Sequence, residues 1–251
     1  MSVRPLDLLF PRRCAGCGRG PWPFCRGCRD ALEPLAPPWC ARCGGPSLLD
    51  VPACRDCPPP DVTLVRAAFR YAGPAREAVH RLKFSGWRDV AAALADAMVA
   101  AADPAPADVV TWVPLARRRL AERGYDQARA LAAAVGRRLD LPVARLIRRP
   151  VATGPQARRG GEDRRRAMRD AFVPVRAAPA RVILVDDVLT TGATAAACAA
   201  ALRGAGALEV SVLAAARSVR TSAPALRRGP DAAYPRSGPR PGLWLPGDHP
   251  R

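Results

Sequence analysis

The sequence predicts an α/β protein in which helices cover a parallel sheet, with a small cysteine-rich unit in front of it. Short β-branched runs alternate with helical periodicity from Asp61 onward, and eight of the nine cysteines precede that residue. One run, residues 181–185, is apolar on both faces, which is typical of a central parallel strand, and the alternation is typical of a sheet covered by helices. We therefore expect a cysteine-rich domain at 1–60, an α/β domain at 61–218 and a disordered Pro/Arg-rich tail at 219–251.

The spacing of apolar residues places the elements of the α/β domain. Strands are expected at residues 62–71 (a strand or a hairpin), 108–113, 141–147, 181–185 and 209–215. Helices are expected at residues 87–102, 128–139 and 193–203, where apolar side chains recur three and four positions apart.

The composition supports a packed core and an anionic partner. Apolar residues make up 49% of the chain and the formal net charge is +18. Residues 111–176 hold 17 arginines against six acidic residues, whereas residues 61–110 are balanced. This clustering favours an anionic ligand near the middle segment. Lys83 is the single lysine among 40 basic residues, so drift in base composition is the alternative explanation for part of the charge.

No stretch of the sequence predicts a membrane span. The most apolar stretch, residues 90–102, contains Asp96 and is shorter than the roughly 20 residues that cross a bilayer. The first residues lack the apolar core of a signal peptide. We therefore expect a cytoplasmic protein, in which thiols stay reduced and cysteines serve purposes other than disulfides.

The cysteines form four CxxC pairs, which predict two structural zinc ions. Two thiolates separated by two residues can hold one metal from a tight turn, so eight ligands fill two tetrahedral sites. The simplest connectivity is two consecutive ribbons; a cross-braced arrangement, first pair with third, is the alternative, and redox chemistry is the rival function. The metal ligands are expected to be Cys14, Cys17, Cys25 and Cys28, then Cys40, Cys43, Cys54 and Cys57.

The segment after the strand at 181–185 predicts a site for a phosphorylated sugar. Asp186 and Asp187 can accept hydrogen bonds from vicinal hydroxyls and stabilise positive charge on the ring. The residues that follow them predict a phosphate cradle at the start of a helix, with three hydroxyls and a glycine that permits close backbone approach. These residues are Thr190, Thr191, Gly192, Ala193 and Thr194.

This segment, residues 182–194, resembles the signature of type I phosphoribosyltransferases, which bind phosphoribosyl pyrophosphate (PRPP). With the cysteine array in front, the chain resembles the ComF family of competence-associated proteins from about Leu6 to Arg217. Further matching stretches are Arg81 to Phe84, Val113 to Leu115, Arg123 to Gln127, Thr153 with Gln156, and Arg164 to Phe172.

The resemblance implies a type I phosphoribosyltransferase fold and a role for each part of the site. Asp186 and Asp187 would hold the ribose hydroxyls and offset the developing charge, and residues 190–194 would hold the 5′-phosphate. Residues 150–170 would form a mobile loop, and magnesium would be carried by the pyrophosphate. The residues expected to face the pyrophosphate are Arg117, Arg118, Arg119 and Arg123.

Three functions remain open at this point. The first is transfer of a phosphoribosyl group from PRPP to an unidentified acceptor. The second is handling of single-stranded DNA during uptake, together with the uptake machinery, by a basic cleft and the zinc ribbons. The third is a PRPP-sensing regulatory module without catalysis. The low aromatic content, 5%, counts against DNA binding by base stacking.

Overall fold

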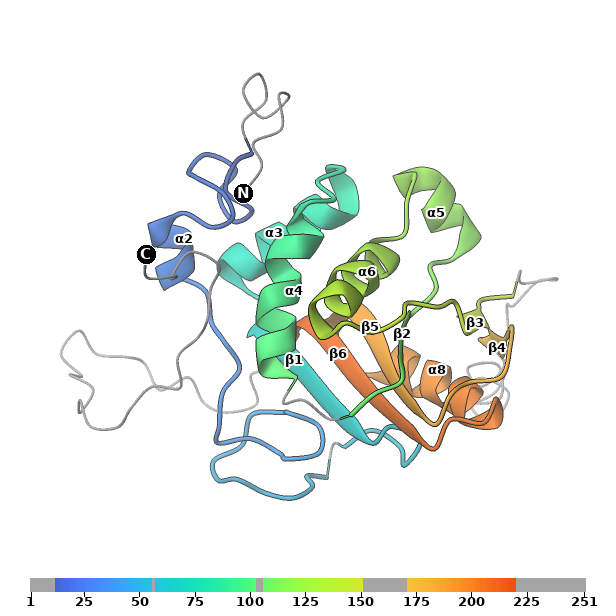
Figure 1. Cartoon of the computed structure of the whole chain (residues 1–251). Helices are drawn as coiled ribbons and strands as arrows, with labels where there is room; N and C mark the ends of the chain where they lie inside the picture. The colour runs from blue at the N-terminus through green and yellow to red at the C-terminus, as the bar shows by residue number, and fades with distance from the viewer. Residues whose placement is uncertain (1–11, 56, 103–105, 151–170, 220–251) are drawn as a thin grey trace, which may run out of the picture.

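A four-stranded parallel sheet forms the centre of the computed structural model, which describes residues 12–55, 57–102, 106–150 and 171–219. The strand order is β1-β6-β5-β2, and β5 pairs with both β6 and β2. Residues 182–185 of β5 are buried, as predicted for a central strand. The strands are β1 (Leu64–Arg70), β2 (Val109–Trp112), β5 (Arg181–Leu189) and β6 (Glu209–Arg217) (Figure 1).

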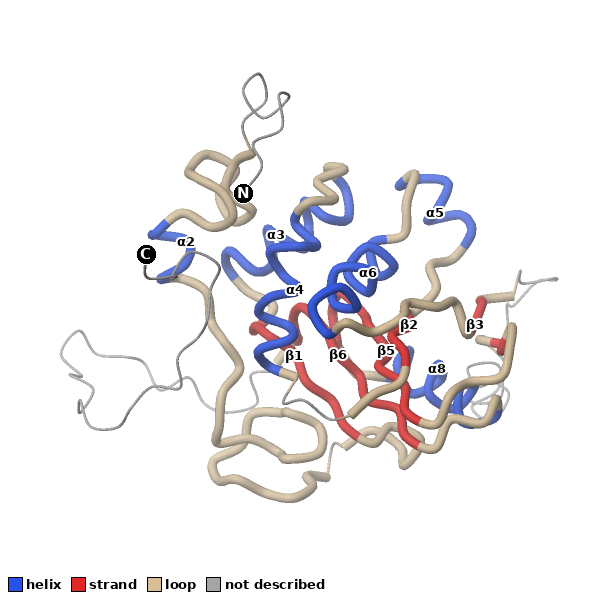
Figure 2. The backbone as a smooth tube through the Cα atoms, viewed as in Figure 1, coloured by secondary structure: helices blue, strands red, loops and turns tan. Residues whose placement is uncertain are grey.

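Helices cover both faces of the sheet, which confirms the predicted fold class. Helices α3 (Gly73–Phe84), α4 (Val90–Ala101) and α6 (Gln127–Leu139) lie on one face (Figures 1 and 2). Helix α8 (Ala193–Gly204) lies on the other. Each helix turns an apolar stripe toward the strands, as periodic spacing dictates. Fully buried examples are Leu94 and Met98 of α4, Leu131 and Val135 of α6, and Cys198 and Leu202 of α8.

Two helices of the α/β domain have no counterpart in the sequence prediction. Helix α3 begins with Gly73 and Pro74, and a proline at the start of a helix is a usable signal because its missing N–H needs no partner there. Helix α5 (Arg117–Arg123) has no buried residue. A helix without an apolar stripe gives no periodic signal, which explains why α5 is invisible to pattern analysis.

The strand expected at 141–147 is wrong. In this stretch the chain forms a single bridge, in which Val110 donates to Pro142 and accepts from Ala144. Pro142 has no N–H to extend a ladder. Ile147 belongs instead to a small antiparallel pair formed by β3 (Ile147–Arg148) and β4 (Val173–Pro174).

The carboxyl ends of β2 and β5 lie side by side, since the two strands pair in parallel. The chain leaves β2 toward α5 and α6 on one face, and it leaves β5 toward α8 on the opposite face. Connections that diverge in this way open the space where ligands of α/β sheets bind. Most of the predicted sugar-phosphate residues therefore lie at this position.

The cysteine-rich region is mostly loop, apart from the short helix α2 (Arg26–Asp30) (Figure 2). Strand β1 lies at the edge of the sheet. The segment between the two groups of cysteines covers this edge. Leu35 N donates to Ala68 O at 3.0 Å, and Arg70 N donates to Glu33 O at 2.8 Å. Unpaired edge groups favour association with other chains, so this cover protects the sheet.

Within the described residues, no helix has the length and apolarity that crossing a bilayer requires. The residues predicted as a tail, from 220 onward, and residues 151–170 of the predicted mobile loop lie outside the described part of the chain.

Candidate functional site

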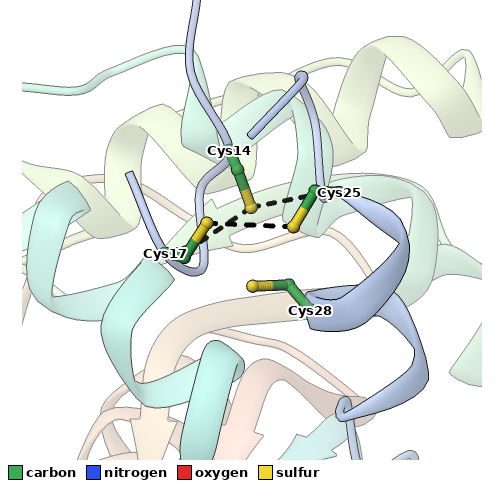
Figure 3. A group of neighbouring side chains, drawn as sticks. All are labelled: Cys14, Cys17, Cys25 and Cys28. Carbon is green, nitrogen blue, oxygen red and sulfur yellow. Dashed lines mark hydrogen bonds between the residues drawn. The ribbon is translucent and has the colours of Figure 1, made fainter. Parts of the chain in front are cut away.

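The first four cysteines converge on one point. Figure 3 shows Cys14, Cys17, Cys25 and Cys28 pointing toward a common centre. Cys14 Sγ accepts hydrogen bonds from the backbone N–H of Cys17 at 3.5 Å and of Cys25 at 3.3 Å. These donors stabilise a thiolate, the form that binds metal.

The second four cysteines repeat the arrangement. Cys40 Sγ accepts from the backbone N–H of Cys43 at 3.5 Å and of Cys54 at 3.2 Å. The sulfurs of Cys40 and Cys57, and those of Cys43 and Cys54, are 3.5 Å apart. In both groups the first cysteine therefore accepts hydrogen bonds from the backbone N–H of the second and of the third cysteine.

The sulfur spacing fits zinc. A tetrahedral site with Zn–S bonds of about 2.3 Å places its sulfurs about 3.8 Å apart, and the Cys17 and Cys25 sulfurs are 3.8 Å apart. In each group all four sulfurs lie within 4.8 Å of one another. The grouping is consecutive, so the cross-braced alternative is wrong. Four thiolates fill each tetrahedron, which makes both sites structural and leaves no open position for catalysis.

One arginine of the α/β domain donates hydrogen bonds to the backbone of each ribbon. Arg81 of α3 donates to the carbonyl oxygens of Ala15, at 2.8 Å, and of Gly16. Arg217, at the end of β6, donates to the carbonyl oxygen of Cys43. Both contacts go to backbone within a CxxC turn or beside it, so they position the metal-binding loops.

Asp187 is buried within a hydrogen-bonded cluster. Strand β5 continues beyond the predicted residues to Leu189, so both carboxylates belong to the strand. Asp187 Oδ1 is 2.7 Å from Lys83 Nζ at the end of α3, and its Oδ2 accepts from Gln127 Nε2 at 2.8 Å. The side chain of Asp187 is 7% exposed and that of Lys83 is 19% exposed. Three elements thus meet at one carboxylate.

Asp186 has a different environment. It is half-buried, and its Oδ1 accepts from the backbone N–H of Asp187 at 2.8 Å. Burial, together with the neighbouring charge of Asp187, raises the pKa of Asp186 above its ordinary value.

The predicted phosphate turn is open to solvent. Thr190, Thr191 and Thr194 are exposed. Gly192 has φ +74°, a left-handed conformation that glycine adopts readily, and it begins α8. Ala193 N donates to Thr191 Oγ1 at 3.4 Å, while other N–H groups of the first helical turn have no intrahelical acceptor. The turn can therefore receive an anion.

A cleft of about 540 Å³ lies between α3 and α5. Two of the four predicted arginines, Arg119 and Arg123, line it, together with Lys83. Arg117 and Arg118 are not among its lining residues. Arg118 instead pairs with Glu122 at 2.9 Å on the exposed surface of α5.

The sequence did not predict the contacts of three residues next to the site, which are Lys83, Asp126 and Gln127. Lys83 could have been noticed because it is the single lysine of the chain. Gln127 and Asp126 follow Arg123 and Gly124 at the start of α6. Asp126 caps that helix, accepting from Ala128 N at 3.0 Å and Arg129 N at 3.2 Å, and burial raises its pKa.

Comparison with known proteins agrees with this architecture. Residues 5–58 match the family described as double zinc ribbon domain. DNA utilization protein YhgH of Escherichia coli O157:H7 is 32% identical over 223 residues, which cover 82% of this chain and 96% of that protein. Competence protein F of Haemophilus influenzae is 29% identical over 213 residues, covering 78% and 90%.

Competence protein ComFC of Bacillus subtilis is 28% identical over 184 residues, covering 68% of this chain and 73% of that protein. Among solved structures, an allosteric regulatory enzyme of purine biosynthesis is similar, with 24% identity and a TM-score of 0.38. Glutamine PRPP amidotransferase from B. subtilis has 22% identity and a TM-score of 0.40. Each alignment covers 55% of this chain and 30% of the other. The identity with YhgH extends over most of both proteins, and on that basis the chain belongs to the ComF family of competence and DNA utilization proteins.

Proposed function

We propose that the protein binds PRPP at the carboxyl end of β5. The observation that carries this proposal is the open turn at residues 190–194, which begins a helix directly after Asp186 and Asp187. A helix N-terminus with exposed hydroxyls suits a phosphate ester. Carboxylates three and four positions before the turn suit the hydroxyls of the attached sugar.

Lys83 takes part in this binding. Its ammonium group pairs with Asp187, so movement of Lys83 toward the ligand would free one carboxylate oxygen for a sugar hydroxyl. Lys83 lines the cleft together with Arg119 and Arg123. A pyrophosphate group bound in that cleft would offer Lys83 a new anionic partner. Lys83 would then pair with the pyrophosphate, and Asp187 would accept hydrogen bonds from the sugar hydroxyl and from Gln127.

Magnesium fits this site as part of the ligand. Among the described residues, the two cysteine groups are the sole sets of three or more side chains close enough to hold a metal. Mg²⁺ is commonly bound through substrate phosphates and a few carboxylates, and Asp186 and Asp187 are the carboxylates available. When bound, the ion would neutralise charge on the departing pyrophosphate.

The reaction we propose is transfer of the phosphoribosyl group to an acceptor. Positive charge develops on the sugar ring as pyrophosphate departs, and Asp186 and Asp187 would stabilise that charge. The acceptor and pyrophosphate then share the cleft between α3 and α5. Because eight thiolates must stay reduced to hold zinc, we place the protein in the cytoplasm.

Calorimetry tests the proposal. Titration of PRPP with Mg²⁺ into the zinc-loaded protein should release heat, and the double variant Asp186→Asn with Asp187→Asn should not bind. Arg76→Gln, on the exposed side of α3, is the matched control and should bind as the unaltered protein does. Absence of heat with the unaltered protein would refute both the enzyme and the sensor. Binding without pyrophosphate release in the presence of candidate acceptors would favour a PRPP sensor.

Handling of single-stranded DNA is the second candidate, favoured by the names of the relatives and by the basic middle segment. Aromatic faces near the cleft are covered by the chain's own arginines: Arg123 lies over Phe84 and Arg88 over Tyr125, each at 4.8 Å. DNA would therefore bind through its phosphates. Affinity should fall steeply with salt, and a flat salt response would exclude this function.

A further inference from the structure

Arg217 connects the second zinc ribbon to the phosphate turn. It ends β6 and is in register with Leu189, the last residue of β5. The next residue, Ser218, donates its backbone N–H to Leu189 O at 2.8 Å. The backbone position of Arg217 is thus fixed beside the point where the turn at Thr190 begins.

The side chain of Arg217 reaches the metal-binding loop of the second ribbon. One guanidinium nitrogen donates to Cys43 O, and the other is 4.0 Å from Cys43 Sγ. A Cβ built on Gly45 would come 3.4 Å from the same nitrogen. The glycine therefore leaves room for the guanidinium beside the zinc-binding sulfur.

The second ribbon and the phosphate turn are in close contact around this arginine. A space of about 20 Å³ remains between them, lined on the turn side by Thr190, Thr191 and Gly192 and on the ribbon side by Cys43 and Pro58. That volume is close to the minimum for one water molecule. The ribbon and the turn therefore line the same small space beside Arg217.

Electrostatics favours the same arrangement. A zinc ion with four thiolates carries a net charge of −2, and a guanidinium hydrogen-bonded near a ligand is a typical outer partner of such a site. A phosphate ester in the turn would place a second anion near the same cation. Loss of either anion weakens the attraction that holds Arg217 in place.

We propose that the second zinc ribbon is a working part of the phosphate site and that Arg217 is the positioning residue between them. Zinc retention by Cys40, Cys43, Cys54 and Cys57 and phosphate-ester binding at the turn then stabilise each other, since coupling between two sites is reciprocal. The ligand side of this inference rests on the proposed function. The first ribbon is attached through Arg81 to α3 and lacks this link.

Hydrogen exchange of the turn tests the coupling without any ligand. The zinc-loaded chain is compared with Arg217→Gln and with the matched control Arg81→Gln, which removes the corresponding anchor of the first ribbon. Arg217→Gln should raise amide exchange about tenfold at Ala196, whose N–H bonds to Gly192 O across the turn at 2.9 Å, and Arg81→Gln should leave it unchanged. Cys54→Ser, which removes the second zinc ion, should raise exchange at the same amide. Arg217→Lys, which keeps the charge, should restore part of the protection.

A second measurement follows zinc transfer to a chromogenic chelator. PRPP with Mg²⁺ should slow release of one of the two zinc ions in the unaltered chain and in Arg81→Gln, but not in Arg217→Gln. Unchanged exchange at Ala196 in Arg217→Gln would overturn the proposal, as would an equal rise throughout β5 and β6. If PRPP fails to bind the unaltered chain, the proposed function falls, whereas the exchange experiment still decides the role of the ribbon.

Discussion

The pair formed by Lys83 and Asp187 allows a stability effect to be worked out from the structure. The two charged atoms are 2.7 Å apart, and the side chains are 19% and 7% exposed. Removing one partner of a fully buried pair costs about 3–5 kcal/mol because a charge is left unpaired. Gln127 retains its hydrogen bond to Asp187. We therefore expect Lys83→Gln to lower the free energy of unfolding by about 2–3 kcal/mol.

The opposite substitution should cost less. In Asp187→Asn the ammonium group of Lys83 remains, and its partial exposure lets it turn toward water. Because the ammonium group can be hydrated in this way, we expect a loss of about 1 kcal/mol. The double variant should lose about 1–2 kcal/mol, less than the sum of the single losses.

Urea denaturation of the four zinc-loaded proteins at neutral pH measures this cycle. Arg76→Gln is the control, because its exposed pair with Glu77, at 3.3 Å, should contribute less than about 0.5 kcal/mol. The loss of the double variant is compared with the sum of the two single losses. If the two values agree within about 0.5 kcal/mol, Lys83 and Asp187 are not coupled. That result would refute the reasoning.

Three further outcomes are expected. Elemental analysis should find two zinc ions per chain, and Cys17→Ser should retain one. Burial and Asp187 raise the pKa of Asp186 to about 8, so its contribution to stability is present in acid and lost as pH rises toward that value; Asp186→Asn should flatten this fall in urea titrations across pH 4–8. Asp126→Ala removes the cap of α6 and should lower stability by about 1 kcal/mol, with an unchanged midpoint contradicting that role.

The elements that the sequence predicts best are those whose side chains face a core. The run at 181–185 and the stripes of α4, α6 and α8 gave clear periods because burial selects apolar residues there. The failures have physical reasons of the opposite kind. Helix α5 buries nothing, and residues 141–147 form a single bridge with Val110 of β2 before the chain reaches β3.

The site divides in the same way. Residues adjacent in sequence, such as the CxxC pairs and the turn after β5, could be located from spacing alone. The contact of Lys83 with Asp187 joins residues 104 positions apart on α3 and β5, so it depends on packing that no local pattern encodes. The hydrogen bond from Arg217 to Cys43 likewise joins residues 174 positions apart.

The edge of the sheet provides a last prediction, on the dependence of the α/β domain on the ribbons. Backbone groups of β1 bond to the cysteine-rich region at Glu33, Leu35 and Arg42, whose carbonyl accepts from Val65 N at 2.8 Å. A chain that begins at residue 61 loses all three partners and exposes an edge strand, so it should associate or aggregate. A chain that begins at residue 32 lacks the first ribbon but keeps all three partners, and it should retain the oligomeric state of the full chain. Light scattering distinguishes the two chains, and equal behaviour of both would show that the edge needs no cover.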